Sequence, residues 1–284
     1  MEKYLFDYET ANLIEAAIGG EKKALEELLM GVKDIVFNLS LRMLGVLPDA
    51  EDATQDILIR VMTNLSSFRK ECAFKTWVYR LAINYLLNYK KSMFSHYLLD
   101  FEIYGNDIRY AKVDETEELI DELSKDELAE ELKLACTNVM LQCLDAESRC
   151  IFIMGTIFKI DSRLAGEVLN ITPEAYRQRL SRVRKKMAKF LAFHCGLTET
   201  GICSCRNRVN YAVSQERINP LRLDFTNLCQ SEKSTLQECK VDMEKLDALA
   251  CSFERFPYYQ STITAQMIIE MLINSEHLKR VQQF

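Results

Sequence analysis

The chain has 284 residues, of which 48% are hydrophobic and 27% charged, and its formal net charge is −6. This length and composition predict two or three globular domains with sizeable cores. They argue against a membrane protein, because no run approaches the roughly 18 consecutive apolar residues of a spanning helix. Only four prolines and nine glycines occur, which favours an all-α fold with short connections.

The N-terminus and the cysteines indicate where the protein works. The first residues, MEKYLFDYET, contain no apolar run behind a basic start, so we expect no signal peptide. Ten cysteines in a long chain without an export signal are better explained as reduced thiols than as a disulfide framework. We therefore expect a cytoplasmic protein with no membrane partner.

The first 65 residues are predicted to form three helices. Residues 11–44 read as two amphipathic helices separated near Gly19-Gly20, and Gly45 ends the second. Pro48-Asp49 opens the third, DAEDATQDILIRVMTNL, whose early carboxylates complement the helix dipole. The expected buried positions are Leu25, Leu28, Leu29, Val32, Ile35, Val36 and Leu39 in the second helix and Ala53, Ile57, Val61 and Leu65 in the third.

The stretch FKTWVYRLAINYLLNYKK, residues 74–91, interleaves aromatic and basic side chains on one predicted helix. It has a tryptophan, three tyrosines and a phenylalanine, four cationic residues and no acidic residue. We place Trp77 and Leu81 inward. Two interpretations remain open at this point. The stretch is either a core helix with a basic edge, or a surface on which extruded bases stack while lysines follow the backbone.

The next segment is strongly acidic and is followed by renewed helical order. Residues 100–131 contain thirteen acidic and three basic residues, which suggests a linker with a partly helical end. Apolar periodicity resumes near Leu132, and Asp145–Phe158 is predicted to be a further helix.

Residues 159–191 follow the pattern of a helix-turn-helix. Asp161 or Ser162 caps a short helix, with Leu164, Ala165 and Val168 inward, and Asn170-Ile171 turns the chain. Thr172 and Pro173 open a second helix with seven basic residues and one acidic residue between 173 and 189. Its apolar stripe is Leu180, Val183, Met187 and Phe190/Leu191. The residues facing away from that stripe include Arg177, Gln178, Ser181, Arg182 and Lys185. We expect them to contact DNA, although a solvated charged helix would show the same pattern.

The remaining residues form a third part that begins with clustered soft ligands. His194, Cys195, Cys203 and Cys205 lie within twelve residues, and structural zinc takes four such ligands. The spacing is not that of a standard zinc finger. The thiols could instead form a redox pair or pack as small hydrophobic groups. No other cofactor is expected.

Two motif sets carry a family resemblance that covers about residues 11–191. PDAEDATQDILIRVMTNLSSFRKECAFKTWVYRLAINYLLNYKKS resembles the second conserved region of bacterial sigma factors of the extracytoplasmic-function (ECF) group. LDAESRCIFIMGTIFKIDSRLAGEVLNITPEAYRQRLSRVRKKM is similar to their fourth region, the helix-turn-helix that reads the upstream promoter element. The resemblance implies an all-α protein with four parts. These are region 2 (1–93), an acidic linker (94–131), region 4 (132–192) and a C-terminal extension of unknown role (193–284).

The resemblance also implies site residues and partners. The partners are RNA polymerase core, through the clamp of its largest subunit, promoter DNA and an anti-sigma regulator. Polymerase contacts are expected from Asp49, Asp52, Gln55, Asp56 and Arg60. Contacts to the −10 element are expected from Phe68, Arg69, Phe74, Lys75, Trp77, Arg80, Asn84, Lys90 and Lys91. Contacts to the −35 element are expected from Arg177, Gln178, Arg179, Ser181, Arg182, Arg184 and Lys185.

Departures from the family pattern affect the sequence that is recognised rather than the role. This chain has RLAG where relatives commonly have EIA, and Gly166 should weaken that helix slightly. The alternative function is a conventional helix-turn-helix regulator with a C-terminal sensor domain. An enzyme is least supported, because the sequence shows neither a metal-spaced carboxylate cluster in a basic context nor a glycine-rich phosphate loop.

Overall fold

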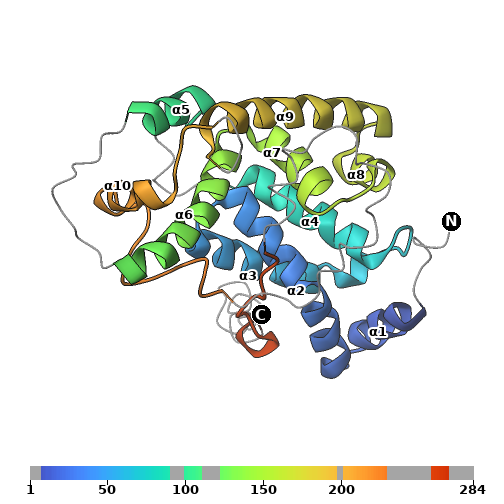
Figure 1. The fold of residues 1–284 in the computed structure, drawn as a ribbon. Coiled ribbons are helices and arrows are strands. Elements are labelled where there is room, and N and C mark those ends of the chain that lie inside the picture. The colour runs from blue at the N-terminus through green and yellow to red at the C-terminus, as the bar shows by residue number, and fades with distance from the viewer. Residues whose placement is uncertain (1–7, 90–98, 111–121, 197–200, 229–256, 269–284) are drawn as a thin grey trace. The chain divides into compact units, whose positions relative to one another are not determined.

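The computed structural model describes residues 8–89, 99–110, 122–196, 201–228 and 257–268 (Figure 1). These residues form helices, and the only β-type pairing among them is an isolated bridge between Asn219 and Arg222. The predicted all-α class is confirmed. Within the same residues, no helix combines the length and the apolar character needed to cross a bilayer.

The chain divides into two compact units. The first contains residues 1–90, 168–170 and 259–284, and the second contains residues 91–167 and 171–258. The C-terminal extension is therefore shared between them. Of its described residues, 201–228 belong to the second unit and 259–268 to the first.

The first unit is built around one long helix. Its elements are α1 (Tyr8–Ile18), α2 (Lys22–Leu44), α3 (Leu47–Thr63), the short turn η1 (Leu65–Ser67) and α4 (Phe74–Asn88). Helix α2 contacts α1, α3 and α4, so its apolar residues form the centre of the core. Gly45 ends α2 with a φ of 79°, a left-handed conformation that glycine adopts without steric cost.

Most of the predicted buried positions of this unit are confirmed, but those of α4 are wrong. Ala53, Ile57 and Val61 of α3 are buried, and so is Leu65, which lies in η1 rather than in α3. The predicted α2 residues are buried except Leu25 and Ile35, which are half-buried. In α4, however, Trp77 and Leu81 are only half-buried. The fully buried apolar residues of α4 are Phe74, Val78, Ala82, Ile83 and Leu86. The buried face of α4 is therefore centred on Val78 and Ala82 rather than on Trp77 and Leu81. Trp77 lies at the edge of the core, where its ring packs beside Phe68 and Phe74.

The second unit contains the helix-turn-helix and the first part of the extension. Its elements are α5 (Phe101–Tyr110), α6 (Glu122–Gln142), α7 (Ala146–Phe152), η3 (Ile153–Ile157), α8 (Ser162–Leu169), α9 (Pro173–His194), η4 (Arg206–Arg208) and α10 (Val209–Ser214). The predicted acidic linker contains α5, and its boundary at 131/132 falls inside α6. Phe101 and Tyr104 of α5 pack against Phe190 of α9, with ring centroids 4.9 and 5.7 Å apart.

A buried arginine joins α6 to α7. The Arg149 guanidinium donates hydrogen bonds to the carbonyl oxygens of Leu141 and Leu144, at 2.9 and 2.8 Å, near the C-terminal end of α6. The Leu141 carbonyl also accepts a hydrogen bond from Leu144 N–H at 3.1 Å, and the guanidinium adds a cation that complements the helix dipole. Burial lowers the pKa of Arg149 to about 10, so it stays charged at neutral pH.

The predicted caps of the helix-turn-helix are confirmed. Asp161 Oδ1 accepts hydrogen bonds from the backbone N–H groups of Arg163 and Leu164, at 2.9 and 3.2 Å. Thr172 Oγ1 accepts one from Ala175 N–H at 3.1 Å, and Pro173 follows at the first helical position. Both caps satisfy orphan donors at a helix start, which fixes where α8 and α9 begin.

Gly166 has a packing reason that its helix propensity does not reveal. A Cβ atom at this position would lie 2.7 Å from the carbonyl oxygen of Ile171, and Ile171 N–H donates to the Gly166 carbonyl at 2.9 Å. The turn between α8 and α9 thus passes directly over the glycine. Sequence reasoning interpreted this glycine only as a weak point of the helix.

Two carboxylates attach the extension to the second unit. Glu131 of α6 is buried and accepts hydrogen bonds from the backbone N–H groups of residues 224–226, at 2.8 to 3.2 Å. Asp107 of α5 accepts from Tyr211 at 2.6 Å and pairs with Arg208 and Arg217. The pKa of Asp107 is lowered by these hydrogen bonds and charges, although burial alone would raise it. Residues 208–226 are therefore an integral layer of this unit.

Gly166→Ala should destabilise the protein, whereas helix propensity alone predicts stabilisation by up to about 1 kcal/mol. The new methyl group would overlap the Ile171 carbonyl, which costs roughly 1–3 kcal/mol. Gly31→Ala in α2 is the matched control, because a Cβ there meets no atom within 4 Å. Thermal unfolding of the full chain should show a lower midpoint for Gly166→Ala only. Equal midpoints for the two variants would contradict the packing argument.

Candidate nucleic-acid interface

Helix α9 presents a basic face opposite its buried stripe. Tyr176, Leu180, Val183, Met187, Phe190 and Leu191 are buried, so the stripe expected at Leu180, Val183, Met187 and Phe190/Leu191 is confirmed. The residues expected to face away from it, Arg177, Gln178, Ser181, Arg182 and Lys185, are all exposed. Their side chains combine guanidinium, amide, hydroxyl and ammonium groups, which suit both base edges and phosphates in a major groove.

Two arginines of α9 make hydrogen bonds within the protein instead. Arg184 is half-buried and donates to Thr156 Oγ1 at 3.0 Å and to the Gly155 carbonyl at 2.8 Å. Arg179 pairs with Glu147 of α7. Arg177 is exposed and also donates to Ser162 Oγ at 2.9 Å, at the start of α8. In this conformation Arg184 and Arg179 hold α9 against η3 and α7, whereas Arg182 and Lys185, like Lys186 and Lys189, are exposed.

A row of polar residues follows the exposed side of α3. Asp52, Asp56 and Arg60 are exposed, and Asp49 and Gln55 are half-buried. Asp56 accepts a hydrogen bond from the Tyr85 hydroxyl at 2.6 Å, and the Arg60 guanidinium lies 5.0 Å from the centre of the Tyr85 ring. Tyr85 of α4 therefore supports two residues of this row, a role that the α4 sequence pattern gave no reason to expect.

The aromatic residues around the start of α4 form a packed cluster. Phe68 lies 5.9 Å from Phe74 and 5.3 Å from Trp77, measured between ring centroids. Phe68 and Phe74 are buried, and Trp77 is half-buried. The cluster holds the loop of residues 68–73 against the helix, so these rings position the loop. Arg69, Lys75 and Asn84 are exposed around it, Arg80 is half-buried, and Lys90 and Lys91 lie outside the described residues.

The three tyrosines of α4 have different surroundings. Burial raises the pKa of Tyr79 well above its ordinary value. Burial also raises the pKa values of Tyr85 and Tyr89, and the carboxylates of α3 raise them further. Tyr85 and Tyr89 therefore face the carboxylates of the polar row of α3, which would repel a phosphate backbone. Neither their position nor the burial of Tyr79 favours stacking on a base, so the exposed side chain of Asn84 is the better candidate for contacting DNA.

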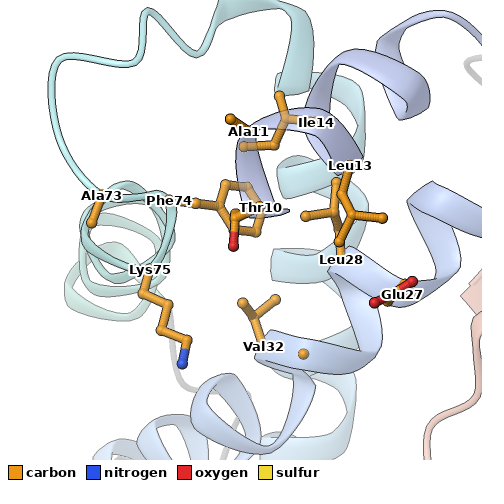
Figure 2. A pocket seen from close by; sticks show the side chains of 11 residues that line it. Thr10, Ala11, Leu13, Ile14, Glu27, Leu28, Val32, Ala73, Phe74 and Lys75 are labelled. Carbon is orange, nitrogen blue, oxygen red and sulfur yellow. The ribbon is translucent and has the colours of Figure 1, made fainter. Parts of the chain in front are cut away.

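A pocket of about 360 Å³ opens beside the start of α4 (Figure 2). Its walls come from three helices: Thr10, Ala11, Leu13 and Ile14 of α1, Glu27, Leu28, Gly31 and Val32 of α2, and Phe74 and Lys75 of α4, with Ala73 before them. The lining is mainly apolar, with one hydroxyl, one carboxylate and one ammonium group. Sequence reasoning missed the contribution of α1, because nothing in that helix distinguishes pocket residues from core residues.

The predicted ligand cluster is only partly brought together. The ring of His194 packs on Phe190, with centroids 4.7 Å apart, and burial lowers its pKa. Cys195, Cys203 and Cys205 lie near one another and near Cys136 of α6. Burial is the main cause that raises the pKa of Cys136 to about 12, and the three other thiols add to it. Among the described residues, no group of three or more His, Cys, Asp or Glu side chains is arranged to hold a metal ion.

Comparison with known proteins identifies one family model and several similar sequences. Residues 28–92 match the family model of sigma-70 region 2. The chain is 27% identical over 175 residues to the ECF RNA polymerase sigma factor SigW of Bacillus subtilis, and this match covers 61% of the chain and 91% of that relative.

Two other relatives match over a shorter segment. The chain is 32% identical over 77 residues to the RNA polymerase sigma-H factor of Pseudomonas aeruginosa. It is 36% identical over 77 residues to the ECF RNA polymerase sigma-E factor of Haemophilus influenzae. Each of these matches covers 27% of the chain and 40% of the relative, so less than half of either relative is represented.

Arg184→Ala should lower the stability of the protein, whereas Arg182→Ala should not. The first substitution leaves the Gly155 carbonyl and the Thr156 hydroxyl without their donor, which costs roughly 1–3 kcal/mol. Arg182 is exposed, and its loss should change stability by less than about 0.5 kcal/mol. Chemical denaturation of both variants beside the parent measures the difference. A stable Arg184→Ala protein would contradict the structural role.

Proposed function

The chain belongs to the ECF group of the sigma-70 family, and from this membership we propose that it directs RNA polymerase core to specific promoters and initiates transcription there. The observation that carries the proposal is the region 2 match, which coincides with helices α2, α3 and α4 of one compact unit. A conventional helix-turn-helix regulator would need α9 but not this unit, and is not favoured.

The proposal assigns a separate binding role to each of three surfaces. The polar row of α3, with Asp49, Asp52, Gln55, Asp56 and Arg60, binds the clamp of the largest polymerase subunit. The exposed face of α9 reads the −35 element, with Arg182 and Lys185 as its principal cations. Specificity there comes from side chains on base edges, and affinity comes mainly from phosphate contacts.

The loop of residues 68–73 and the start of α4 capture the melted −10 element. The aromatic cluster of Phe68, Phe74 and Trp77 holds the loop in place, while Arg69, Lys75, Arg80 and Asn84 supply the polar contacts. The pocket beside Phe74 and Lys75 accepts an extruded base, since its apolar walls suit a base face and its few polar groups suit a base edge. Lys90 and Lys91 are proposed as further cationic contacts from their place in the sequence.

The chain acts without chemistry of its own in this scheme. Core polymerase supplies catalysis, and promoter recognition requires no cofactor. We place the protein in the cytoplasm, where polymerase and DNA are found. We also propose an anti-sigma protein as regulator, because the surfaces of α3 and α9 must be covered when transcription is not required.

A run-off transcription assay tests the function. Core polymerase with this protein, supplied with a randomised promoter library, should start transcription from a defined subset of templates. Core alone should not. If the mixture gains no promoter-dependent start, the proposed function is wrong.

Within the same assay, Asn84→Ala should impair promoter opening more than promoter binding. Permanganate reactivity of melted thymines measures opening, and a gel shift of the complete holoenzyme measures binding. Asn88→Ala is the matched control, because the Asn88 amide already donates to the Asn84 carbonyl at 2.7 Å, one turn earlier in the helix. Equal losses of opening and binding in Asn84→Ala would contradict a role in strand capture.

We further propose that the cysteine cluster holds one structural zinc ion, with Cys195, Cys203 and Cys205 as ligands. Of the two candidates for the fourth ligand, Cys136 fits better than His194. The Cys136 thiol is influenced by the other three thiols and lies 2.8 Å from the Tyr104 hydroxyl, a hydrogen bond that would stabilise a thiolate, whereas the His194 ring is engaged on Phe190. Three of the four residues belong to the extension and α6 supplies the fourth, so zinc would strengthen the attachment of the extension.

Metal analysis of the purified protein tests this proposal. We expect one zinc ion per chain, lost in Cys136→Ser and retained in His194→Ala. Addition of a chelator should lower the unfolding midpoint of the parent but not that of Cys136→Ser. Zinc-free protein from zinc-supplemented cells would show that the thiols are not a metal site.

A further inference from the structure

The last described residues, 257–268, include a segment that lies on α2 within the first unit. This segment, residues 259–268, comes from the extension and is far in sequence from the helix that it covers (Figure 1). We call it the strap. Tyr259, Ser261, Ile263 and Ile268 of the strap are buried, so it is packed on the unit along its length.

Asn38 of α2 makes a reciprocal pair of hydrogen bonds with the strap backbone. The Asn38 amide nitrogen donates to the Tyr259 carbonyl at 2.6 Å, and Tyr259 N–H donates to the Asn38 amide oxygen at 2.9 Å. One turn earlier, Asp34 accepts from Ser261 N–H at 2.9 Å. Lys33 donates to the Ser261 carbonyl at 2.9 Å. Side chains of α2 thus pair with the strap much as a neighbouring strand would.

The ring of Tyr259 covers Arg42, one turn beyond Asn38. The guanidinium lies 5.5 Å from the ring centroid, and both residues are fully buried. Burial lowers the pKa of Arg42. A buried guanidinium has lost most of its hydration, which is a considerable cost even with an aromatic ring above it.

Asp34, Asn38 and Arg42 are spaced four residues apart and form one polar stripe on α2. A stripe of this kind normally faces water, because each of its groups is well hydrated. Release of the strap would break its contacts with α2, but it would also return Arg42, Asn38 and Asp34 to water. Release would also expose Tyr259, Ile263 and Ile268 of the strap, so the covered state is favoured, and hydration of the three polar groups of α2 reduces that preference.

The strap also reaches the beginning of α3. Thr262 Oγ1 lies 3.4 Å from Glu51 Oε1, and Glu51 stands between Asp49 and Asp52 in the first turns of that helix. A macromolecule that binds the polar row of α3 and extends onto α2 would meet the strap there.

We propose that residues 259–268 form a reversible strap that competes with RNA polymerase core for the surface made by the polar stripe of α2 and the start of α3. This inference rests on the proposed function, since it takes polymerase core as the competing partner. When the strap is seated, core meets a partly occupied surface. When it leaves, the stripe and the start of α3 are exposed together.

The measured affinity for core then depends on the fraction of molecules in which the strap is released. A partner that binds only the uncovered state has an apparent Kd equal to its intrinsic Kd divided by that fraction. Substitutions that weaken the strap should therefore tighten binding to core, which is the opposite of what damage to a binding domain does.

Two variants of the full chain test this proposal. Ile263→Ala removes a buried apolar side chain of the strap, and Tyr259→Ala removes the ring above Arg42, so both substitutions leave the surface of α2 and α3 unchanged. We expect each to bind core about fivefold or more tightly and to increase hydrogen exchange at the strap amides of residues 259–263. Asn12→Ala, at an exposed position of α1, is the matched control and should change neither quantity.

The possible results distinguish a failure of the strap competition from a failure of the proposed function. If Ile263→Ala and Tyr259→Ala increase exchange in the strap but leave the Kd for core unchanged, or raise it, the competition is refuted. The strap is then a structural part of the unit, and its loss should appear as a lower unfolding midpoint. If the parent and all variants bind core but none supports promoter-dependent transcription, the proposed function fails while the competition stands.

Discussion

A buried polar side chain must find a hydrogen-bond partner, and this requirement determines how the C-terminal extension is attached. Glu131 on α6 is satisfied by the amides of residues 224–226, and Asn38 on α2 is satisfied by the backbone of Tyr259. In each case a long helix carries a side chain that would face water if the helix stood in an isolated domain. The extension supplies backbone groups in place of water, so its attachment is specific in register as well as in position.

Features that depend on local sequence were predictable. The caps at Asp161 and Thr172, the glycine end of α2 and the apolar stripe of α9 follow from the chemistry of a few neighbouring residues. The inward face of α4 was not, because Trp77 packs beside Phe68 and Phe74 at the edge of the core. Burial of Asn38 and Arg42 was equally hidden, since the segment that covers them lies more than two hundred residues away in the sequence.

The candidate site illustrates the same limit. Exposure of Arg182, Lys185 and Asn84 follows from helical periodicity once the buried stripes are known. The hydrogen bonds of Arg184 and of Tyr85 do not, because they depend on which residue of a neighbouring helix stands opposite. A basic or aromatic residue in a binding motif can therefore serve to place the surface rather than to touch its ligand. The aromatic stretch of residues 74–88 contains both kinds of residue.

The attachment of residues 224–226 to Glu131 has a kinetic consequence for the strap. Because Thr226 is held on the second unit and Tyr259 follows in the same chain, release of the strap is a unimolecular event. Its occupancy does not change when the protein is diluted or produced in larger amounts. Binding of core, in contrast, depends on the concentration of free core. The share of molecules bound to core is therefore set by the concentration of free core relative to the apparent Kd, and not by how many copies of the protein the cell contains.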